Sequence, residues 1–296
     1  MTEARACYAI STMSDPVPSL SLSGWALILG ASSGFGEAAA LTLSRLGMDI
    51  CGVHLDRRST MPNVERIVAA VRGHGRQALF LNVNAADEGK RQEVIDQLAA
   101  ATAAAGAPRV RLLMHSLAFG TLRPFIGALA GPGEAGASDA KPDEAVIGKP
   151  HMDMTSDVMG HSLVYWTQGL YRAGLLGAGS RILSMTSAGG HRVMPAYGAV
   201  SAAKAALEAH TRQLAYELAP LGVTANALCA GVTDTPALRK IPGSETLISE
   251  GLKRNPARRL TTPHDVADAI ALLAHPLSGW ITGNVIHVDG GEDIAG

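Results

Sequence analysis

The sequence predicts an α/β fold, a doubly wound parallel sheet that forms a single domain. Two observations predict it: short apolar runs alternate with longer amphipathic segments along the chain, and a glycine-rich turn follows the first apolar run. Strands that helices cover on both faces are expected to be continuously apolar, as these runs are. The chain has 296 residues, 47% of them hydrophobic, which is enough to build one large core.

The elements follow in chain order. "WALILG" (25–30) is apolar almost throughout and predicts a buried strand, whereas "EAAALTLSRLG" (37–47) has apolar residues at helical spacing and ends on a glycine. Further strands are predicted over 49–55, 77–83, 109–116, 180–187, 223–229 and 284–290. Further helices are predicted over 64–75, 90–106, 153–176, 197–219 and 264–274. Periodicity leaves the order of the strands in the sheet open.

Three segments fall outside this alternation. The Ser- and Pro-rich residues 1–23 predict a disordered tail, which leaves 24–296 as the single domain. Residues 127–150 are rich in Gly, Ala, Pro and acidic residues and predict a flexible insertion. Residues 234–260 follow the sixth strand at the carboxyl end of the sheet, where ligands bind in open α/β folds. They predict a lid over the substrate, with a plain surface loop as the alternative.

Composition excludes several classes of protein. The net charge is −1, so there is no basic surplus to bind nucleic acid or an anionic membrane. No apolar run approaches the roughly 20 residues that cross a bilayer, and the N-terminus lacks the features of a secretory signal. Cys7, Cys51 and Cys229 show neither a disulfide framework nor metal-ligand spacing. A cytoplasmic protein with no metal site is therefore expected.

The turn "GASSGFG" (30–36) indicates a dinucleotide site, because it lies between the first predicted strand and the first predicted helix. Glycines at this place allow a tight turn and let the backbone approach a pyrophosphate, and the helix N-terminus offers free N–H groups. The pattern predicts a Rossmann-type fold. The cofactor-binding residues predicted in this turn are Gly30, Ser32, Ser33, Gly34, Phe35 and Gly36.

The end of the second predicted strand, within "VHLDRRS" (53–59), selects between NAD and NADP. An acidic residue there favours the ribose hydroxyls of NAD, and basic residues favour the 2′-phosphate of NADP. His54 and Leu55 occupy the discriminating positions, and Arg57 and Arg58 follow closely enough to hold a phosphate. We therefore predict NADPH as the cofactor. Asp56 favours NADH instead, and a solvated charged turn is a third interpretation.

Taken together, the motifs resemble the short-chain dehydrogenase/reductase family over residues 24–293. The motifs are "GASSGFG", "HSLAFG" (115–120), "SMTSAGG" (184–190), Tyr197 with Lys204, "AGVTDT" (230–235) and "GNVIHVDGG" (283–291). The resemblance implies that the domain is a dinucleotide-binding catalytic domain.

Three departures from the common family pattern resemble the enoyl-acyl-carrier-protein reductase branch. Most members have Asn-Asn-Ala-Gly where this chain has "HSLAFG", and Tyr-x-x-x-Lys where this chain has Val200 at the tyrosine position. The usual helix asparagine is missing from "MTSDVMGHS" (154–162). Ser187 stands where common enoyl reductases have a second tyrosine, but "GASSGFG" and "GTLRPF" resemble the NADPH-dependent variant with a conventional glycine loop.

The seven-residue spacing of Tyr197 and Lys204 also has a chemical interpretation. Positions seven apart on a helix lie on nearly the same face, and the tyrosine is shifted by about 4.5 Å along the axis from the common spacing. In carbonyl reduction, the oxygen that takes the proton is bonded to the carbon that takes the hydride. In enoyl thioester reduction, negative charge develops on an oxygen several bonds away, where a donor must be aimed. The shifted tyrosine fits the second reaction.

The resemblance implies roles for these residues. Tyr197 would bind the enolate oxygen, Lys204 would bind the nicotinamide ribose, and Ser187 would orient substrate or serve a structural role. His115 is expected to be structural, although histidines often act as acids or bases. The remaining residues implied at the cofactor are Asn82 and Val83 at the adenine, Ser116, Leu117 and Ala118 along it, and Gly231, Val232, Thr233 and Thr235 over the nicotinamide.

The function predicted is hydride transfer from NAD(P)H to the β-carbon of a 2-enoyl thioester carried by acyl-carrier protein or coenzyme A. A carbonyl reductase with a shifted tyrosine and a non-catalytic NAD(P)-sensing protein are the alternatives. The retention of both Tyr197 and Lys204 argues against a sensor, which needs neither. The resemblance implies a homotetramer or homodimer.

Overall fold

The computed structural model describes residues 20–104, 109–127, 146–241 and 243–295. The predicted disordered tail therefore lies outside the described residues except for its last four positions. Most of the predicted insertion at 127–150 also lies outside them, although its last two residues begin a helix, α5.

Seven parallel strands form one sheet in the order β3-β2-β1-β4-β5-β6-β7, which confirms the doubly wound parallel sheet. After β3 the chain crosses back over β1 to form β4, so the two halves of the sheet meet between β1 and β4. Ligands bind at such a switch point in open α/β sheets. The strands are β1 (Trp25–Leu29), β2 (Asp49–His54), β3 (Ala78–Asn82), β4 (Val110–His115), β5 (Arg181–Ser187), β6 (Thr224–Ala230) and β7 (Val285–Val288).

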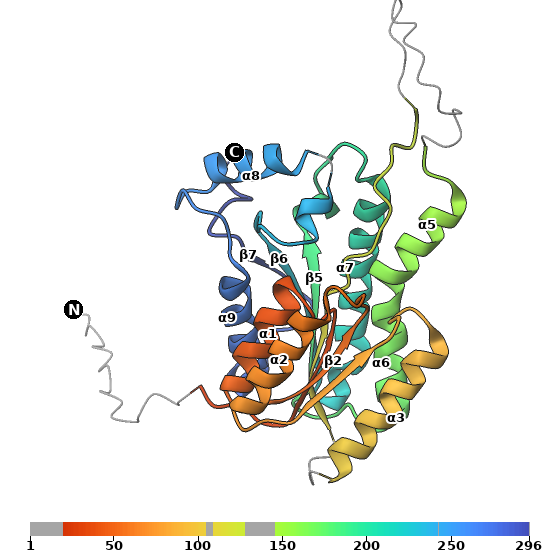
Figure 1. The fold of residues 1–296 in the computed structure, drawn as a ribbon, viewed down its shortest axis with the longest axis vertical. Coiled ribbons are helices and arrows are strands. Elements are labelled where there is room, and N and C mark those ends of the chain that lie inside the picture. The colour runs from red at the N-terminus through yellow and green to blue at the C-terminus, as the bar shows by residue number, and fades with distance from the viewer. Residues whose placement is uncertain (1–19, 105–108, 128–145, 242, 296) are drawn as a thin grey trace, which may run out of the picture.

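Helices cover both faces of the sheet (Figure 1). One face carries α1 (Gly34–Arg45), α2 (Met61–Gly73) and α9 (Pro263–Ala274), and the other carries α3 (Glu88–Ala104), α6 (Ser162–Arg172) and α7 (Gly198–Leu218). Alternate residues of β1 enter the two cores, with Leu27 on the α3, α6 and α7 side and Ile28 on the other. Both residues are fully buried, as the apolar strand runs predict.

Two regions differ from the sequence-based prediction. The helix predicted over 153–176 is α5 (Lys149–Ser156), a π-helix η1 (Asp157–His161) and α6. The predicted lid contains the short 3₁₀ turn η4 (Leu238–Lys240) and a helix, α8 (Ser244–Arg254), that was not predicted. Figure 1 shows α8 at the end of the molecule toward which the arrow of β5 points. Further 3₁₀ turns are η2 (Ala188–Gly190), η3 (Ala219–Leu221) and η5 (Pro276–Ser278).

Over the ranges that the structure covers, no helix combines the length and the apolar character needed to span a bilayer.

Candidate active site

The glycine-rich turn has the geometry that a pyrophosphate site requires. Gly30 has a φ of 89°, and a Cβ placed on it would lie 2.5 Å from the carbonyl oxygen of Ser116. A Cβ on Gly36 would lie 1.9 Å from the Gly30 carbonyl oxygen, so side chains are excluded from both positions. Ser33 precedes α1 without making a side-chain cap, which leaves the first N–H groups of the helix for a ligand. The residues present therefore fit a dinucleotide.

The carboxyl end of β2 places a carboxylate at this turn. Asp56 Oδ2 lies 3.0 Å from His54 Nδ1, and the amide side chain of Asn82 bonds both backbone groups of Asp56 at 2.9 and 3.0 Å. Burial opposes ionisation, but the hydroxyls of Thr60 and Ser32 and the ring of His54 outweigh it and lower the pKa of Asp56. Burial also lowers the pKa of His54, against the opposing effect of Asp56. A neutral imidazole thus sits beside an ionised carboxylate.

The arginines expected to read the 2′-phosphate follow directly. Arg57 and Arg58 are exposed in the loop between β2 and α2. Among the contacts of the described residues, neither side chain bonds a protein group, whereas the Arg57 carbonyl accepts from Thr60. Both guanidinium groups are therefore placed to meet a ligand from solvent.

The remaining predicted cofactor residues gather around the same edge. The Ser116 N–H donates to Leu29 at 2.9 Å, which starts the segment 116–118 beside the glycine turn. The Val83 N–H donates to His54 at 2.8 Å and extends β3 to this edge. From β6, Thr235 Cγ2 lies 3.5 Å from where a Cβ of Gly34 would stand. The structure thus brings three segments that the family resemblance implies at the cofactor to the same edge of the sheet.

The loop after β6 is internally braced. Thr233 is buried, and its hydroxyl donates to the Gly231 carbonyl at 2.9 Å. The Val232 N–H donates to Glu292 Oε2 at 2.9 Å. This bonding fixes the backbone that the sequence analysis places over the nicotinamide.

Tyr197 stands directly before α7, as its N-cap residue. The preceding Ala196 has a φ of 59°, a conformation that costs energy in a non-glycine residue and turns the chain into the helix. The Tyr197 ring packs on Gly189, where a Cβ would come within 2.4 Å of the ring. Its hydroxyl lies 3.4 Å from Ser187 Oγ at the end of β5. Burial raises the pKa of Tyr197, and the Ser187 bond opposes the effect, so the phenol stays protonated.

Lys204 lies two helical turns further along α7 and is 6% exposed. Its ammonium donates to the carbonyl of Met185 on β5 at 2.6 Å. Burial lowers the pKa of Lys204 to about 8, while the carboxylate of Glu208 opposes the shift. The three predicted catalytic residues, Ser187, Tyr197 and Lys204, are thus brought together at the junction of β5 and α7.

Val200, at the position that usually holds the tyrosine, packs among apolar side chains. It is 3% exposed, and its Cγ2 lies 2.8 Å from where a Cβ of Gly120 would stand. It belongs to an apolar cluster with Met159 and Tyr197. Across α7, the π-helix approaches so closely that a Cβ on Gly160 would lie 3.0 Å from the Ala203 carbonyl oxygen. Position 200 therefore serves packing, which explains why the hydroxyl comes from position 197.

His115 is structural, as expected. It is fully buried at the end of β4, and its Nε2 lies 2.7 Å from Ser162 Oγ. Because the Ser162 hydroxyl donates to Val158, the ring must supply the proton of that contact. Burial and the charge of Lys204 lower the pKa of His115 to about 3, so the ring is neutral.

Sequence reasoning missed a group of contacts that braces the loop leading to Tyr197. Asp293 near the C-terminus forms an ion pair with Arg192 at 2.8 Å and lies 3.2 Å from His191. Burial opposes ionisation, but these partners and His287 lower the pKa of Asp293. No local pattern joins residues about a hundred positions apart, so the sequence carried no signal for this pair.

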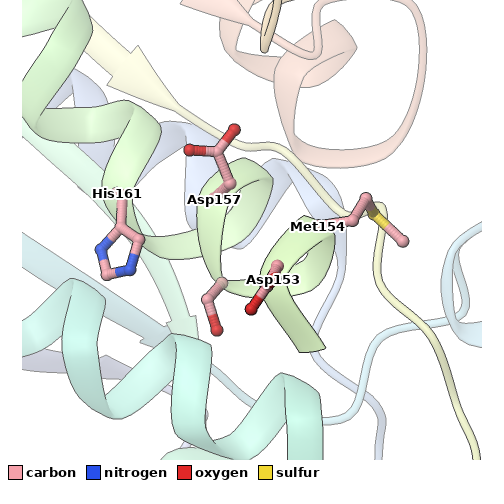
Figure 2. A pocket seen from close by; sticks show the side chains of 5 residues that line it. Asp153, Met154, Asp157 and His161 are labelled. Carbon is pink, nitrogen blue, oxygen red and sulfur yellow. The ribbon is translucent and has the colours of Figure 1, made fainter. Parts of the chain in front are cut away.

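Figure 2 shows a hollow of about 570 Å³ on the surface of α5 and η1. Its lining side chains do not converge: His161 points toward α7, whereas Asp157 and Met154 point elsewhere. His161 Nδ1 lies 3.0 Å from His210 Nε2, so one nitrogen of each ring is hydrogen-bonded to the other ring. Among the residues that the structure places, no three His, Cys, Asp or Glu side chains are grouped to hold a metal ion.

The comparisons with known proteins agree with this geometry. Residues 133–292 match the family described as enoyl-(acyl carrier protein) reductase. The chain belongs to this family. It is an NAD(P)H-dependent oxidoreductase of the short-chain dehydrogenase/reductase type, as the sequence predicts.

Among similar proteins is 1-cyclohexenylcarbonyl-CoA reductase of Streptomyces collinus, 28% identical over 90% of this chain and 86% of that protein. Enoyl-[acyl-carrier-protein] reductase [NADH] FabI of Escherichia coli K12 is 38% identical, but over only 41% of this chain and 46% of that protein. The crystal structure of enoyl-[acyl-carrier-protein] reductase (NADH) from Aquifex aeolicus superposes with a TM-score of 0.76 at 25% identity, and the match covers 94% and 99% of the two chains.

Proposed function

We propose that the chain reduces 2-enoyl thioesters by hydride transfer from NAD(P)H. The observation that carries the proposal is the position of the Tyr197 hydroxyl, at the helix start beside Ser187, while the common tyrosine position holds the packed Val200. Relatives whose names specify enoyl-acyl-carrier-protein and cyclohexenylcarbonyl-CoA substrates support it.

In this proposal the cofactor, when bound, supplies the hydride. The protonated Tyr197 hydroxyl donates a hydrogen bond to the thioester oxygen, on which negative charge develops as the β-carbon is reduced. Lys204 binds the nicotinamide ribose and places a positive charge behind Tyr197. Ser187 orients the tyrosine hydroxyl and the substrate carbonyl.

The direct test is an assay of 2-enoyl thioesters of acyl-carrier protein and coenzyme A, each with NADPH and with NADH. We expect consumption of enoyl thioesters to exceed that of ketones. Faster turnover of ketones would instead indicate a carbonyl reductase. Cofactor binding without turnover of either would indicate a sensor. Assembly as a homotetramer or homodimer stays a prediction.

We propose NADPH as the preferred cofactor. Arg57 and Arg58 bring to the end of β2 two exposed guanidinium groups that bond none of the described residues, against the single carboxylate of Asp56. That carboxylate is already engaged by His54 and nearby hydroxyls, so less of its charge is directed at a ligand. Because the E. coli and Aquifex relatives carry NADH in their names, the two cofactors must be compared directly.

Replacing both arginines with alanine is expected to raise the dissociation constant of NADPH by about 10–100-fold, because charge-assisted hydrogen bonds contribute about 1.5–3 kcal/mol. The dissociation constant of NADH should change less than about threefold, since NADH has no 2′-phosphate. Arg45→Ala, at the exposed far end of α1, is the matched control. Fluorescence titration measures both constants. Equal losses for the two cofactors would show that these arginines do not read the phosphate.

We propose that residues 234–260 are a lid over the acyl chain. Ile241 packs against the apolar cluster that contains Tyr197, and Gly251 of α8 packs on Val232, with its Cβ position 2.8 Å from Val232 Cβ. The far end of the segment is anchored, because Arg254 bonds Glu292 at 3.2 Å. The segment therefore joins a fixed end to a part that contacts the site.

Trypsin is expected to cut the free protein after the exposed Arg239 or Lys240. NADPH together with an unreactive thioester analogue should slow this cleavage by about tenfold or more, because a lid that orders over ligand resists proteolysis. Cleavage after Lys90, on the distant α3, should keep its rate. Mass spectrometry of timed digests identifies the sites. A rate at 239–240 that ligands leave unchanged would argue for a plain surface loop.

A further inference from the structure

The ammonium group of Lys204 lies in a buried environment that disfavours its positive charge. The side chain is almost fully buried, and among the described contacts its ammonium has one hydrogen-bond partner, the Met185 carbonyl. Burial disfavours the charged form of a lysine, and here it lowers the pKa of Lys204 to about 8. This value already includes the opposing effect of the Glu208 carboxylate, without which the pKa of Lys204 would lie lower still.

Glu208 supplies that charge from the next turn of α7. Positions four apart share one face of a helix. A Cβ on Gly190 would lie 3.2 Å from Glu208 Oε1 and 3.5 Å from Lys204 Cβ, so both side chains border the same glycine. The lack of a side chain at Gly190 leaves room for the carboxylate on the lysine side of the helix.

Thr186 holds this carboxylate in place. Its hydroxyl donates to Glu208 Oε1 at 2.6 Å, from the strand position between Met185 and Ser187. The strand that bonds the ammonium through Met185 therefore also bonds the carboxylate through Thr186. Lysine and glutamate are both aligned by adjacent residues of β5.

Three other titratable groups near Lys204, on β4, at the start of α7 and on β6, carry no charge near neutral pH. His115 on β4 is neutral because burial and Lys204 lower its pKa to about 3. Tyr197 is protonated, and the thiol of Cys229 on β6 is neutral because burial and nearby carboxylates raise its pKa to about 12. The charge that acts on Lys204 is that of Glu208.

We propose that Thr186 and Glu208 are a positioning pair that keeps the ammonium of Lys204 protonated and directed at the cofactor ribose. The proposal rests on the proposed role of Lys204 in binding cofactor. Glu208 need not touch substrate or cofactor, since it acts through the lysine. The pair would extend the working range of the enzyme to higher pH.

The test measures the dissociation constant of NADPH by fluorescence between pH 6 and pH 10. Affinity that needs the ammonium is lost as the pH rises through the pKa of Lys204. Because Glu208 raises that pKa, Glu208→Gln should move the midpoint of the loss to lower pH by about one unit, the low end of the effect of a nearby carboxylate. Affinity at the low-pH limit should stay within about threefold of the parent.

Matched variants separate this role from folding. Glu217→Gln removes the same charge from an exposed site on the same helix and should keep the parental midpoint. Thr186→Val should shift the midpoint in the direction of Glu208→Gln, and Thr186→Ser, which keeps the hydroxyl, should restore it. If Glu208→Gln does not fold, the comparison of Thr186→Val with Thr186→Ser still tests the proposal. Parental midpoints in Glu208→Gln or Thr186→Val, or an equal shift in Glu217→Gln, would overturn the proposal.

The readout needs no substrate. A shifted NADPH profile in a protein that reduces no enoyl thioester would contradict the proposed function and leave the positioning pair standing. If the protein reduces enoyl thioesters but the variants keep the parental NADPH profile, the proposed function is supported and the positioning pair is contradicted.

Discussion

Tyr197→Phe is expected to lower turnover of enoyl thioesters by about 10²–10³, the usual cost of losing one donor to a developing oxyanion. The change removes the one hydroxyl that stands beside Ser187 at the start of α7. The ring itself packs on Gly189 and should stay in place, so binding of NADPH should change little. Steady-state kinetics and fluorescence titration of the same preparation measure both quantities.

Two further variants control this result. Tyr165→Phe removes a phenol from α6, where the ring lies under Arg91, and should keep parental turnover. Ser187→Ala should lower turnover by less than Tyr197→Phe, because its contact with the tyrosine at 3.4 Å is long for a hydroxyl pair. Parental turnover in Tyr197→Phe, with cofactor binding intact, would remove Tyr197 as the donor.

The spacing of the tyrosine can be examined in the same background. Val200→Tyr added to Tyr197→Phe places a phenol at the common family position. The site is full, because Val200 already lies close to Gly120, so the larger ring should cost about 1–3 kcal/mol of stability. Any activity that returns should favour ketones over enoyl thioesters. Recovery of enoyl activity alone would contradict the geometric argument for the shift.

Much of the fold could be predicted because the five inner strands of the sheet are buried on both faces. Leu27 and Ile28 enter opposite cores, and this double burial is what makes the strand runs continuously apolar. Strand order was left open because each run has the same composition wherever it lies in the sheet. Helix α8 was missed because the segment is mostly polar and only Gly251 among its residues is buried, although its few apolar residues do lie on one face.

The site was predictable where a local pattern sets it. Gly36 is required by a contact within its own turn, and Tyr197 and Lys204 lie on one helix, whereas the contact that requires Gly30 is with the distant Ser116. The spacing of Glu208 four residues after Lys204 was a signal of the same kind, and it was overlooked. The bond from Thr186 to Glu208 joins a strand to a helix, and no local spacing encodes it.

The π-helix at 157–161 was not predictable from local spacing either, since its sequence fits an ordinary helix. It lies in the segment where the family asparagine is missing, and it packs against α7 beside Lys204. Such irregular turns persist where the surroundings require them and are frequent at functional sites.

Lys204→Met is expected to weaken binding of NADPH by about 10–100-fold, the cost of one charge-assisted hydrogen bond, and to lower turnover further. Its effect on stability should have the opposite sign. The pKa of Lys204 falls from 10.5 to about 8 on folding, so below pH 8 the folded protein holds a charge that burial disfavours. Methionine has a similar length and no charge. The variant should therefore be more stable at pH 7, by about 1–3 kcal/mol after loss of the Met185 bond.

The sign of the pH dependence makes this prediction specific. Between about pH 8 and 10.5 the folded protein binds fewer protons at this site than the unfolded chain, so parental stability should rise with pH through that window. The advantage of Lys204→Met should then shrink toward pH 10. Lys90→Met, at an exposed site on α3, should show no such narrowing. Thermal unfolding of the three proteins at pH 7 and pH 10 measures the difference. If Lys204→Met binds NADPH as the parent does, the lysine is not a cofactor ligand. If the variant is less stable than the parent at both pH values, the lysine is not a strained charge. If the variant loses both NADPH affinity and turnover while it gains stability, Lys204 is retained at a cost in stability because the bound cofactor needs its charge.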